Sequence, residues 1–408
     1  MKSHTDGPIV IDASGKDIQG EIASIRARGP VTEVELPGGV PAWSVTDTEL
    51  LKKVLLSSLV SKDAKQHWPA FRDGRIGTDF PLFNWVNTPS MFTAYGPDHR
   101  RLRAPLVPVF TDRRTAALEP RIQAIADDLV KGLDARTGGD PVDLREHFAY
   151  PLPLRVINEL IGVPANLIEP LRKCVDGIFD VAASQEEALA NYQAMLALLE
   201  TLVEYRRDNP AEDMTSALIA HADDPATVFS DAELIGTLYL AINAGHETTV
   251  DLLDQAIFLL LTHPDHLAAA LDGSLPWADV IEETLRFEPS IAHAPLRYAV
   301  DDFVLGDVAI TAGDPILSCP AGANRDPKVY GDSADMFDPT RTNKAHMAFG
   351  HGPHRCPGAP LARLEALVGL TTLFQAFPNM KLAVSPDELG TVPGFIANGH
   401  DRLPVILR

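Results

Sequence analysis

One long apolar segment in the second half of the chain constrains the fold most strongly. It begins at Ser230-Asp-Ala-Glu233, a capping box in which serine and glutamate side chains bind the free backbone amides of a helix start. It ends before Pro264, which cannot continue a helix. About 32 residues at a rise of ~1.5 Å each span ~48 Å, enough to cross a whole domain. Its apolar side chains point in nearly all directions: Leu234, Leu238, Ile242, Leu252, Leu253, Ile257 and Leu260. We therefore expect a central, buried helix.

Six residues near the middle of this segment depart from its apolar character, Ala244-Gly245-His246-Glu247-Thr248-Thr249. A glycine, a carboxylate and two threonines are poor choices for a helix interior. Gly245 would let a flat group pack against the backbone, and Thr248 could divert a helical carbonyl and admit water. Glu247 beside Thr248 supplies an acid and an alcohol that could relay protons into a closed cavity. A polar seam against another helix would explain the same residues equally well.

A second informative segment is the glycine-rich loop Phe349-Gly-His-Gly-Pro-His-Arg-Cys-Pro-Gly358, which carries one thiol at the expected start of a helix. Pro357 suits the first helical position, where its missing N–H costs nothing. Cys356 would then lie at the positive end of the helix dipole, next to Arg355 and near His354. These three features favour a thiolate over a thiol.

The glycines of this loop indicate a close approach of another group. Gly352 and Gly358 lack side chains where something flat would have to contact the backbone. A protected thiolate in such a loop is what a thiolate-ligated haem iron requires. Two other interpretations exist for Cys356: a small buried hydrophobe, or a zinc ligand together with the nearby His346, His351 and His354. The zinc interpretation lacks the paired spacing of ordinary zinc motifs.

Composition limits the class of protein. The 408 residues are 45% hydrophobic and contain no stretch that resembles a domain boundary, so we expect one domain over residues 1–408. Cys174, Cys319 and Cys356 are too scattered for a disulfide framework, which favours a reducing compartment. No signal-peptide core and no run of about eighteen apolar residues is present, so we expect a cytoplasmic protein without a membrane anchor. A formal charge of −21 argues against nucleic acid as a partner.

Positive charge is concentrated in two parts of this acidic chain. Residues 99–121 carry six arginines against two acidic residues, a local charge of +4. Residues 341–365 carry four basic residues against one acidic residue, a local charge of +3. An anionic ligand or an acidic partner would account for both islands, whereas an ordinary solvated helix face would account for either one alone.

The predicted elements are mainly helical. Strand-like runs occur at Val31–Leu36 and Val40–Trp43, and amphipathic helical runs at Thr115–Leu133 and Glu186–Asp208. Residues 61–95 form a long irregular stretch rich in large apolar side chains, which must cover a core edge or a ligand.

Three elements together resemble the cytochrome P450 family in its soluble bacterial form. They are the cysteine loop, the Ala-Gly-His-Glu-Thr-Thr stretch at 244–249, and the pair Glu283 and Arg286, spaced i and i+3 on one helix face. The resemblance extends over essentially the whole chain. It implies a mainly α fold with small β-sheets, in which a helical part adjoins a β-rich N-terminal part, and a monomeric protein that binds haem b.

The resemblance assigns Glu283 and Arg286 to structure rather than to chemistry. In the family this pair supports the segment behind the cysteine loop by bonding to a downstream connector. Residues 324–327 and 337–341 of this chain are similar to that connector.

The resemblance also implies a set of haem contacts. Cys356 would be the axial thiolate and the metal ligand, and His99, Arg103, Arg297 and His354 would bind the propionates. The full cofactor-binding set is His99, Arg103, Ala244, Gly245, Arg297, Phe349, Gly350, His354, Cys356 and Gly358. An acidic ferredoxin, reduced by its own reductase, would dock near the cysteine and meet Arg103, Arg113, Arg114, Lys344 and Arg355.

The implied activity is hydroxylation of C–H bonds with O2 and electrons from that ferredoxin. Glu247 and Thr248 would be the catalytic pair that delivers protons. A non-catalytic haem-thiolate protein that binds a ligand or senses a gas would not need this pair, and a peroxide-driven enzyme typically lacks it.

The expected substrate pocket is lined by Trp85, Met91, Phe92, Leu240, Asn243, Ala244, Ile291, Phe395, Ile396 and Asn398. Nearly all of these are apolar, so we expect a hydrophobic small molecule. Asn243 and Asn398 are possible polar handles, although each could instead satisfy backbone groups. Residues 83–103 resemble members that hydroxylate steroids and macrolides, so we expect a steroid substrate, with a macrolide or other polyketide as the alternative.

Overall fold

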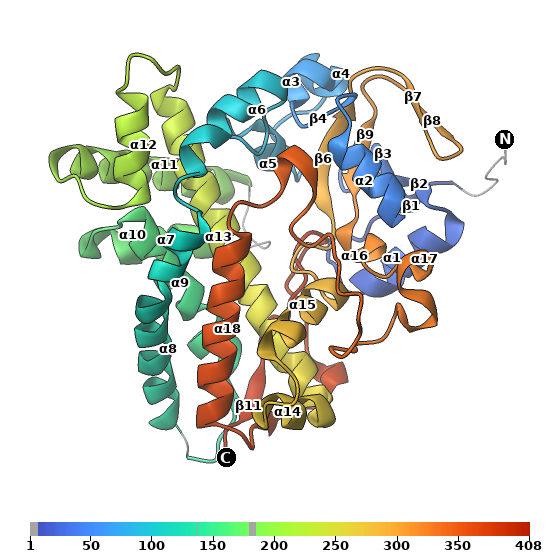
Figure 1. Ribbon diagram of the computed structural model, residues 1–408. Helices are drawn as coiled ribbons and strands as arrows, with labels where there is room; N and C mark the ends of the chain where they lie inside the picture. Colours follow the sequence, from blue (N-terminus) through green and yellow to red (C-terminus); the bar gives the residue numbers. More distant parts are fainter. Residues whose placement is uncertain (1–6, 137, 179–184) are drawn as a thin grey trace.

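The computed structural model describes residues 7–136, 138–178 and 185–408 (Figure 1). Helices dominate it, and the strands gather mainly on one side of the molecule together with the N-terminal helices. The predicted mainly α fold with small β-sheets is confirmed. The helices are α1 (Ile18–Arg28), α2 (Thr48–Leu56), α3 (Ala64–His67), α4 (Pro69–Arg72), α5 (Phe83–Asn87), α6 (Gly96–Arg103), α7 (Asp112–Ala117), α8 (Glu119–Asp134), α9 (Pro151–Ile161), α10 (Ala165–Ile178), α11 (Gln185–Asp208), α12 (Met214–Ala222), α13 (Asp231–Thr262), α14 (Pro264–Leu271), α15 (Trp277–Phe287), α16 (Pro320–Ala323), α17 (Pro327–Tyr330) and α18 (Ala359–Ala376).

The largest sheet is mixed and joins distant parts of the chain. Its strand order is β1-β2-β3-β9-β6-β4, in which β1–β2 and β3–β9 are parallel and the other pairs antiparallel. The strands are β1 (Ile9–Val10), β2 (Val31–Leu36), β3 (Val40–Val45), β4 (Val60–Ser61), β6 (Ala294–Ala299) and β9 (Pro315–Ser318). Register pairs Val34 with Ala42 and Arg297 with Ile316. The sheet therefore carries Arg297 on a central strand rather than on a mobile loop.

Two smaller sheets complete the strand content. An antiparallel sheet of order β10-β11-β5 joins Lys381–Leu382, Pro404–Ile406 and Val142–Asp143. A hairpin pairs β7 (Phe303–Leu305) with β8 (Val308–Ile310), and its turn uses Gly306 at φ +60°. The pairing of β5 with β11 places the C-terminal segment next to a short π-helical turn, η2 (Arg145–Ala149), which follows β5 in the chain.

The long helix α13 forms where the sequence predicts it. Ser230 and Glu233 make the reciprocal capping box, and the helix runs 32 residues to Thr262 before Pro264 begins α14. The run predicted over Thr115–Leu133 is divided into α7 and α8 at Leu118, because Pro120 occupies the first turn of a new helix. Helix α13 passes through the middle of the molecule (Figure 1).

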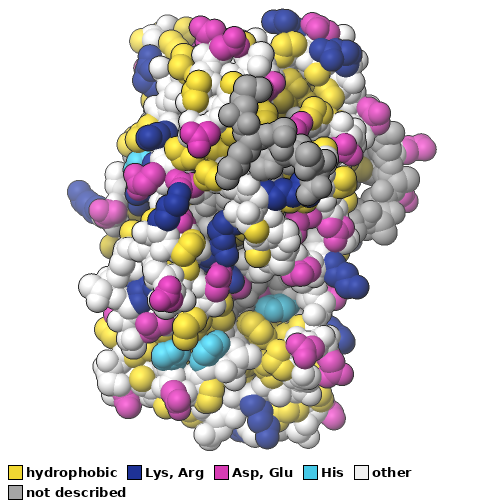
Figure 2. Space-filling model, turned by 90° about the vertical axis from the view of Figure 1, so that its right-hand side faces the viewer, with side chains coloured by type: hydrophobic (Ala, Val, Ile, Leu, Met, Phe, Trp, Pro, Cys, Tyr) yellow, Lys and Arg dark blue, Asp and Glu magenta, His cyan; other side chains and the backbone are white. Residues whose placement is uncertain are grey.

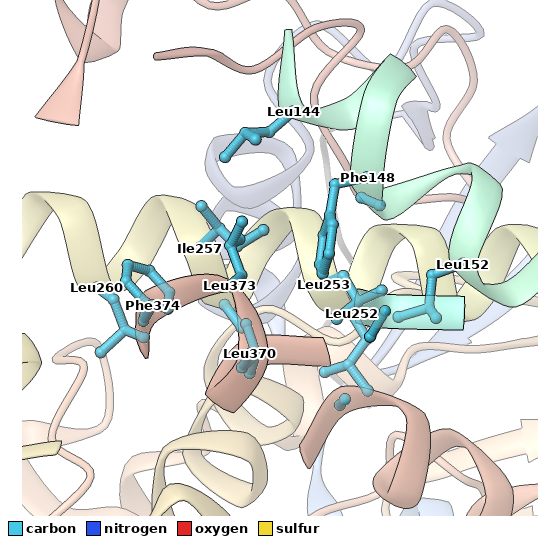
Figure 3. Close-up of a cluster of buried hydrophobic side chains, with 14 of the residues drawn as sticks. Leu144, Phe148, Leu152, Leu252, Leu253, Ile257, Leu260, Leu370, Leu373 and Phe374 are labelled. Atoms are coloured by element: carbon cyan, nitrogen blue, oxygen red, sulfur yellow. The ribbon is translucent and has the colours of Figure 1, made fainter. Parts of the chain in front are cut away.

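The main core lies between α13 and its neighbours. Figure 3 shows aliphatic and aromatic side chains from η2 and the residue before it, and from α9, α13 and α18, converging on one another: Leu144, Phe148, Leu152, Leu252, Leu253, Ile257, Leu260, Leu370, Leu373 and Phe374. All of these are buried. Burial of a Leu or Phe side chain contributes about 1.5–3 kcal/mol, so this cluster fixes the position of α13 relative to α18 and the cysteine loop before it.

Charges on the surface are mixed. On the face shown in Figure 2, basic and acidic side chains are interspersed with apolar ones rather than gathered into a patch of one sign. Among the described residues, no helix is long and apolar enough to cross a membrane.

Candidate functional site

The cysteine loop is held by its own backbone. The Cys356 N–H donates to the Phe349 carbonyl over 2.9 Å, and the Gly350 N–H donates to Met347 over 2.8 Å. Gly350 and Gly352 have φ values of +68° and +71°, which only glycine adopts without strain. The loop therefore presents Cys356 from a tight, preformed turn.

The helix after the loop begins later than predicted. It starts at Ala359, with Gly358 as N-cap and Pro360 in the first turn, so Pro357 lies before the helix. Opposing effects act on the Cys356 thiol. Burial raises the pKa of the Cys356 thiol, although backbone N–H groups of Gly358 and Ala359 and nearby arginines oppose this. The predicted influence of backbone N–H groups and of neighbouring positive charge on the thiol is therefore present, and it acts against burial.

The two loop glycines have different environments. A Cβ on Gly352 would lie 2.8 Å from the Leu55 carbonyl oxygen of α2, so this glycine serves packing of the loop on α2. Gly352 is therefore not the opening for a flat group that the sequence predicts. A Cβ on Gly358 would be 3.8 Å from the Cys356 sulfur, an ordinary contact.

Glu283 and Arg286 form a fully buried ion pair behind this loop. Arg286 donates to both oxygens of Glu283 over 2.7 and 2.8 Å. Its other bonds, of 2.7–2.9 Å, go to the carbonyls of Asn324, Ala334 and Met336. Glu283 also accepts from the Asp338 backbone over 2.8 Å and from Arg341 over 3.2 Å. The pair joins α15 to the connector segments, which is the structural role expected of it.

A cluster of buried cationic groups lies beside the loop. Arg297 and Lys62 are buried, and the Arg297 Nε donates to the Ser318 hydroxyl over 3.3 Å. No carboxylate forms an ion pair with either group within the described part of the chain. Burial lowers the pKa of Arg297 to about 10, and burial together with Arg297 places the pKa of Lys62 well below its usual range.

Two histidines complete this cluster. Burial and nearby cations, Arg103 and Arg297 first among them, lower the pKa of His99 to about 4. Burial, Arg297 and Lys62 lower the pKa of His354 further. The His99 Nε2 atom is buried with no hydrogen-bond partner. Buried groups of like charge are unfavourable unless an anion joins them, so this cluster fits a dianionic ligand.

Lys62 is the member of the cluster that the sequence analysis missed. Its ammonium nitrogen lies 3.6 Å from the centroid of the Phe92 ring and donates to the Pro295 carbonyl over 3.2 Å. A lysine directly after the short strand β4 gives no signal in the sequence, because its burial depends on the distant strand β6. Arg103, by contrast, lies nearer the cysteine, where it donates to the Arg355 carbonyl over 2.8 Å.

The middle of α13 has one accessible strip. Ala244 is exposed, and Leu240 and Thr248 are half-buried, although most of the helix is buried. These residues are four apart and so share one face. Gly245 lies outside this accessible strip. A Cβ atom on Gly245 would lie 2.9 Å from the Cδ1 methyl group of Ile157 in α9. The absence of a side chain at Gly245 thus lets α13 pack closely on α9.

Thr248 and Glu247 are bonded in different directions. The Thr248 hydroxyl donates to the Ala244 carbonyl over 2.7 Å, and the Ser290 hydroxyl donates to the Thr248 carbonyl over 2.6 Å. Glu247 is buried and accepts from Arg145 over 2.5 Å. The acid is thus tied to an arginine of η2, which the sequence analysis did not identify.

The residues predicted to line a substrate pocket divide into two groups. Trp85 is exposed and packs edge-on against Phe92, with ring centroids 5.9 Å apart. Met91 is half-buried and packs against the hydrophobic cluster that includes Leu234 and Leu238 of α13. Phe395 and Ile396 are buried in the cluster under the large sheet. Ile291 and Ala397 form an isolated antiparallel β-bridge. This bridge joins the segment that carries Phe395 and Ile396 to the turn before β6.

The two candidate polar handles differ. The Asn398 amide donates to Glu288 over 2.8 Å and to the Pro289 carbonyl over 3.2 Å, so its donors are occupied and it does not serve as a free handle. Asn243 donates to the Tyr239 carbonyl over 2.9 Å, while its own carbonyl oxygen is buried without a partner. Asn243 therefore offers a buried, unused carbonyl oxygen.

Comparison with known proteins decides the family. A family model described as Cytochrome P450 matches residues 277–388. A 2-hydroxy-5-methyl-1-naphthoate 7-hydroxylase from Streptomyces carzinostaticus is 41% identical over 401 residues, covering 98% of each chain. This chain belongs to the cytochrome P450 family. Relatives of this cytochrome P450 are named hydroxylases and monooxygenases, so the protein is a monooxygenase, and the family carries haem b on a cysteine thiolate.

Solved structures agree over the whole chain. CYP154A1 from Streptomyces coelicolor A3(2) matches with a TM-score of 0.92 at 49% identity, covering 98% of this chain and 100% of that one. A testosterone-bound CYP154C4 from Streptomyces sp. ATCC 11861 matches with a TM-score of 0.95 at 40% identity, covering 98% of each. The P450 fold predicted from three short motifs is therefore confirmed.

Proposed function

We propose that Cys356 is the axial ligand of the haem and that the buried cationic cluster binds its two propionates. Arg297 and Lys62 would supply two full charges, and His99 and His354 would add hydrogen-bond donors. The observation that supports this assignment is the burial of Arg297 and Lys62 without any ion pair among the described residues. Two carboxylates at this position would offset the burial that lowers both pKa values and the repulsion by Arg297 that lowers the pKa of Lys62 further.

The accessible strip of α13 would form the oxygen-binding side. The haem supplies the oxygen-activating chemistry when bound. Thr248 would hold a proton at Oγ, which in the free protein donates to the Ala244 carbonyl. Glu247 would replace that proton after moving from Arg145. Ala244 would let substrate approach the helix closely, since it is exposed on the same face.

Replacing Thr248 tests this pair. In Thr248→Ala we expect less hydroxylated product per NADPH consumed in a system reconstituted with ferredoxin and reductase, since the proton at Oγ is lost. Thr262→Ala is the matched control, because Thr262 makes the same bond to the carbonyl four residues earlier, at the far end of the helix. Undiminished product per NADPH in Thr248→Ala would remove the proton-relay assignment.

We propose a steroid as the substrate, bound against Trp85, Phe92 and Leu240. Support comes from the apolar character of these walls and from the testosterone-bound relative of 40% identity. A macrolide is the second candidate, because the macrolide-type relatives include a mycinamicin IV hydroxylase/epoxidase and a 6-deoxyerythronolide B hydroxylase. Asn243 would offer its carbonyl oxygen to a hydroxyl or amine of the substrate.

A binding screen separates the two substrate classes. Testosterone and a macrolactone are each titrated into the ferric enzyme, and displacement of haem-bound water is followed by the shift of the Soret band. A saturable shift with testosterone, followed by a hydroxylated product, is expected. A shift with the macrolactone alone would reverse the assignment.

For electron delivery we propose an acidic ferredoxin that docks beside the cysteine loop. Arg113, Arg114 and Arg355 are exposed there. Arg103, the last residue of α6, donates a hydrogen bond to the Arg355 carbonyl of the loop. Lys344 is less available to bind an acidic ferredoxin, since its ammonium group already forms an ion pair with Asp279 over 3.2 Å. Reduction by such a donor should slow steeply with added salt.

A further inference from the structure

We propose that Arg145, Asp251, Asp254 and His400 form a path that carries protons from the surface at the C-terminal segment to Glu247. The proposal rests on the proposed role of Glu247 and extends it, because it names how the acid regains a proton after giving one up. None of these four residues belongs to the three motifs from which the family was predicted.

The three carboxyl groups lie on one face of α13. Glu247, Asp251 and Asp254 are spaced i, i+4 and i+7, which places them in one row. All three are buried, and Asp251 and Asp254 are fully so. A row of buried acids on the central helix is costly unless each has a partner, so its presence requires an explanation.

Arg145 joins the inner two acids. One terminal nitrogen of its guanidinium binds Asp251 over 2.9 Å and the other binds Glu247 over 2.5 Å. Arg145 lies in the π-helical turn η2. The backbone N–H of Arg145 donates to the Asp143 carboxylate over 2.9 Å. A π-helical turn often marks a functional site, and here it directs the arginine toward α13.

His400 connects the outer acid to solvent. Both its Nδ1 and its backbone N–H lie close to the same oxygen of Asp254, at 2.8 and 2.9 Å. The His400 side chain is 12% exposed whereas that of Asp254 is 0% exposed, so the imidazole is the outer end of the row. It packs on the Phe258 ring, with centroids 4.5 Å apart, which fixes its orientation.

The charges of this row do not balance. Three carboxyl groups face one guanidinium and one imidazole, so one negative charge remains even when His400 is protonated. The pKa of Asp251 is raised well above its usual value by burial and by Glu247, despite Arg145, while the hydrogen bond to Asp254 raises the pKa of His400 against the effect of its burial. The row therefore holds one exchangeable proton.

Two unused oxygens show where that proton is shared. Oδ2 of Asp251 and Oδ1 of Asp254 are buried without a hydrogen-bond partner. Residues spaced i and i+3 have Cβ atoms about 5–6 Å apart, which brings the two carboxyl groups within reach of one bridging water that can pass the proton between them. Gly399 closes the site from the side, since a Cβ there would lie 2.3 Å from Oδ1 of Asp251.

Each transfer balances without any redox partner. His400 takes a proton from solvent at Nε2 and passes its Nδ1 proton to Asp254. Asp254 passes a proton to Asp251, which passes one to Glu247. Asp251 and Asp254 end in the states in which they began, and Glu247 has gained the one proton that solvent supplied. His400 has exchanged its Nδ1–H tautomer for the Nε2–H tautomer, which is reversed when the imidazole releases the Nε2 proton and takes one up at Nδ1. Arg145 stays protonated throughout, because a guanidinium does not deprotonate in proteins. It positions the two inner acids and keeps them from repelling each other.

Other charged groups adjoin the row. Glu288 acts on the pKa of His400 from the turn after α15, but it is paired with Arg325 over 2.5 Å. His246 faces Tyr150 on the opposite side, and burial lowers its pKa to about 4, so it is neutral at pH 7. Neither group supplies a second route into the row.

The first test reads the shared proton without turnover. In the ferric holoenzyme, a protonated carboxyl group gives an infrared C=O band that shifts in D2O. Asp251→Asn should remove one such band, whereas Asp231→Asn should not, because Asp231 is 90% exposed at the start of the same helix. The buried Glu365, whose pKa burial also raises, should keep its own band in both variants. An unchanged spectrum in Asp251→Asn would overturn the proposal.

The second test measures delivery. Asp254→Asn and His400→Gln should each lower kcat, by up to the roughly 10²–10⁴-fold that general acid–base catalysis contributes, and raise the solvent isotope effect. The dissociation constant of the substrate and the carbon monoxide spectrum should not change. Wild-type kcat in both variants would overturn the path, provided that Glu247→Gln still reduces product per NADPH. If Glu247→Gln also has no effect, the proposed role of Glu247 fails as well.

Discussion

The imidazole rings of His99 and His354 lie with their centroids 3.8 Å apart and their planes tilted by 36°. One ring comes from α6 and the other from the cysteine loop, so the contact joins two segments that are far apart in the chain. Both pKa values are lowered, by burial first and then by nearby cations. Neutral imidazole rings can pack in this tilted arrangement. Each ring keeps one N–H group that can donate a hydrogen bond to the same anion.

The first prediction concerns Lys62. In Lys62→Met the haem should dissociate faster, by about tenfold to a hundredfold, because a charge-assisted hydrogen bond of roughly 1.5–3 kcal/mol is lost. The apoprotein should become more stable at the same time, since a buried amine is replaced by an apolar side chain of similar length. Haem transfer to excess apomyoglobin and urea unfolding of the apoprotein measure the two effects.

Lys65→Met is the control for this experiment. Lys65 lies three residues further along, in α3, and its side chain is exposed. It should leave haem transfer unchanged. Equal transfer rates in Lys62→Met and the wild type would show that Lys62 does not bind the propionates.

The second prediction concerns the seating of the cysteine loop on α2. Gly352→Ala should weaken the thiolate-type carbon monoxide spectrum, because its Cβ would lie 2.8 Å from the Leu55 carbonyl oxygen. Gly331→Ala separates this clash from backbone strain: Gly331 has a similar φ of +63° but open space around a Cβ. If both variants lose the spectrum to the same extent, strain rather than the contact with α2 is responsible.

The third prediction is a pH dependence. Although burial opposes it, hydrogen bonds from Arg363 and His346 lower the pKa of Glu282 to about 2. A lowered folded-state pKa gives stability that is present above the unfolded value of 4.5 and is lost as the pH falls toward 2. At about 1.36 kcal/mol per pKa unit, the contribution is at most roughly 3 kcal/mol.

Denaturant unfolding between neutral pH and pH 2 measures this contribution. Glu282→Gln should be less stable than the wild type at pH 7 and should lose less stability on acidification. Glu49→Gln removes an exposed pair with Lys52 and should change stability by less than about 1 kcal/mol. Parallel pH profiles for the wild type and Glu282→Gln would contradict the assignment.

Several features could be predicted from the sequence because they depend on local spacing. The capping box at Ser230 and the proline at 264 set the limits of α13 to within two residues. The spacing of Glu283 and Arg286 on one helix turn is enough to pair them, and their burial follows from the connector segments that bond to them.

Other features depend on contacts between distant segments. Gly245 faces α9 and Asn398 bonds to Glu288, neither of which a local pattern reveals. For Cys356 the sequence reveals the neighbouring positive charges that lower the pKa of the thiol, but not the burial that raises it. The acidic row on α13 is not predictable from local spacing, since its partners, Arg145 and His400, are distant from it and from each other in the sequence.

The carbon monoxide difference spectrum of the reduced protein tests the central claim most directly. The wild type, Cys174→Ala and Cys319→Ala should all show the red-shifted band of thiolate-bound haem, because both of those cysteines are buried elsewhere. Cys356→Ala should lack that band while retaining the folded helical signal in circular dichroism. A red-shifted band that survives in Cys356→Ala would contradict the assignment of Cys356 as the haem ligand.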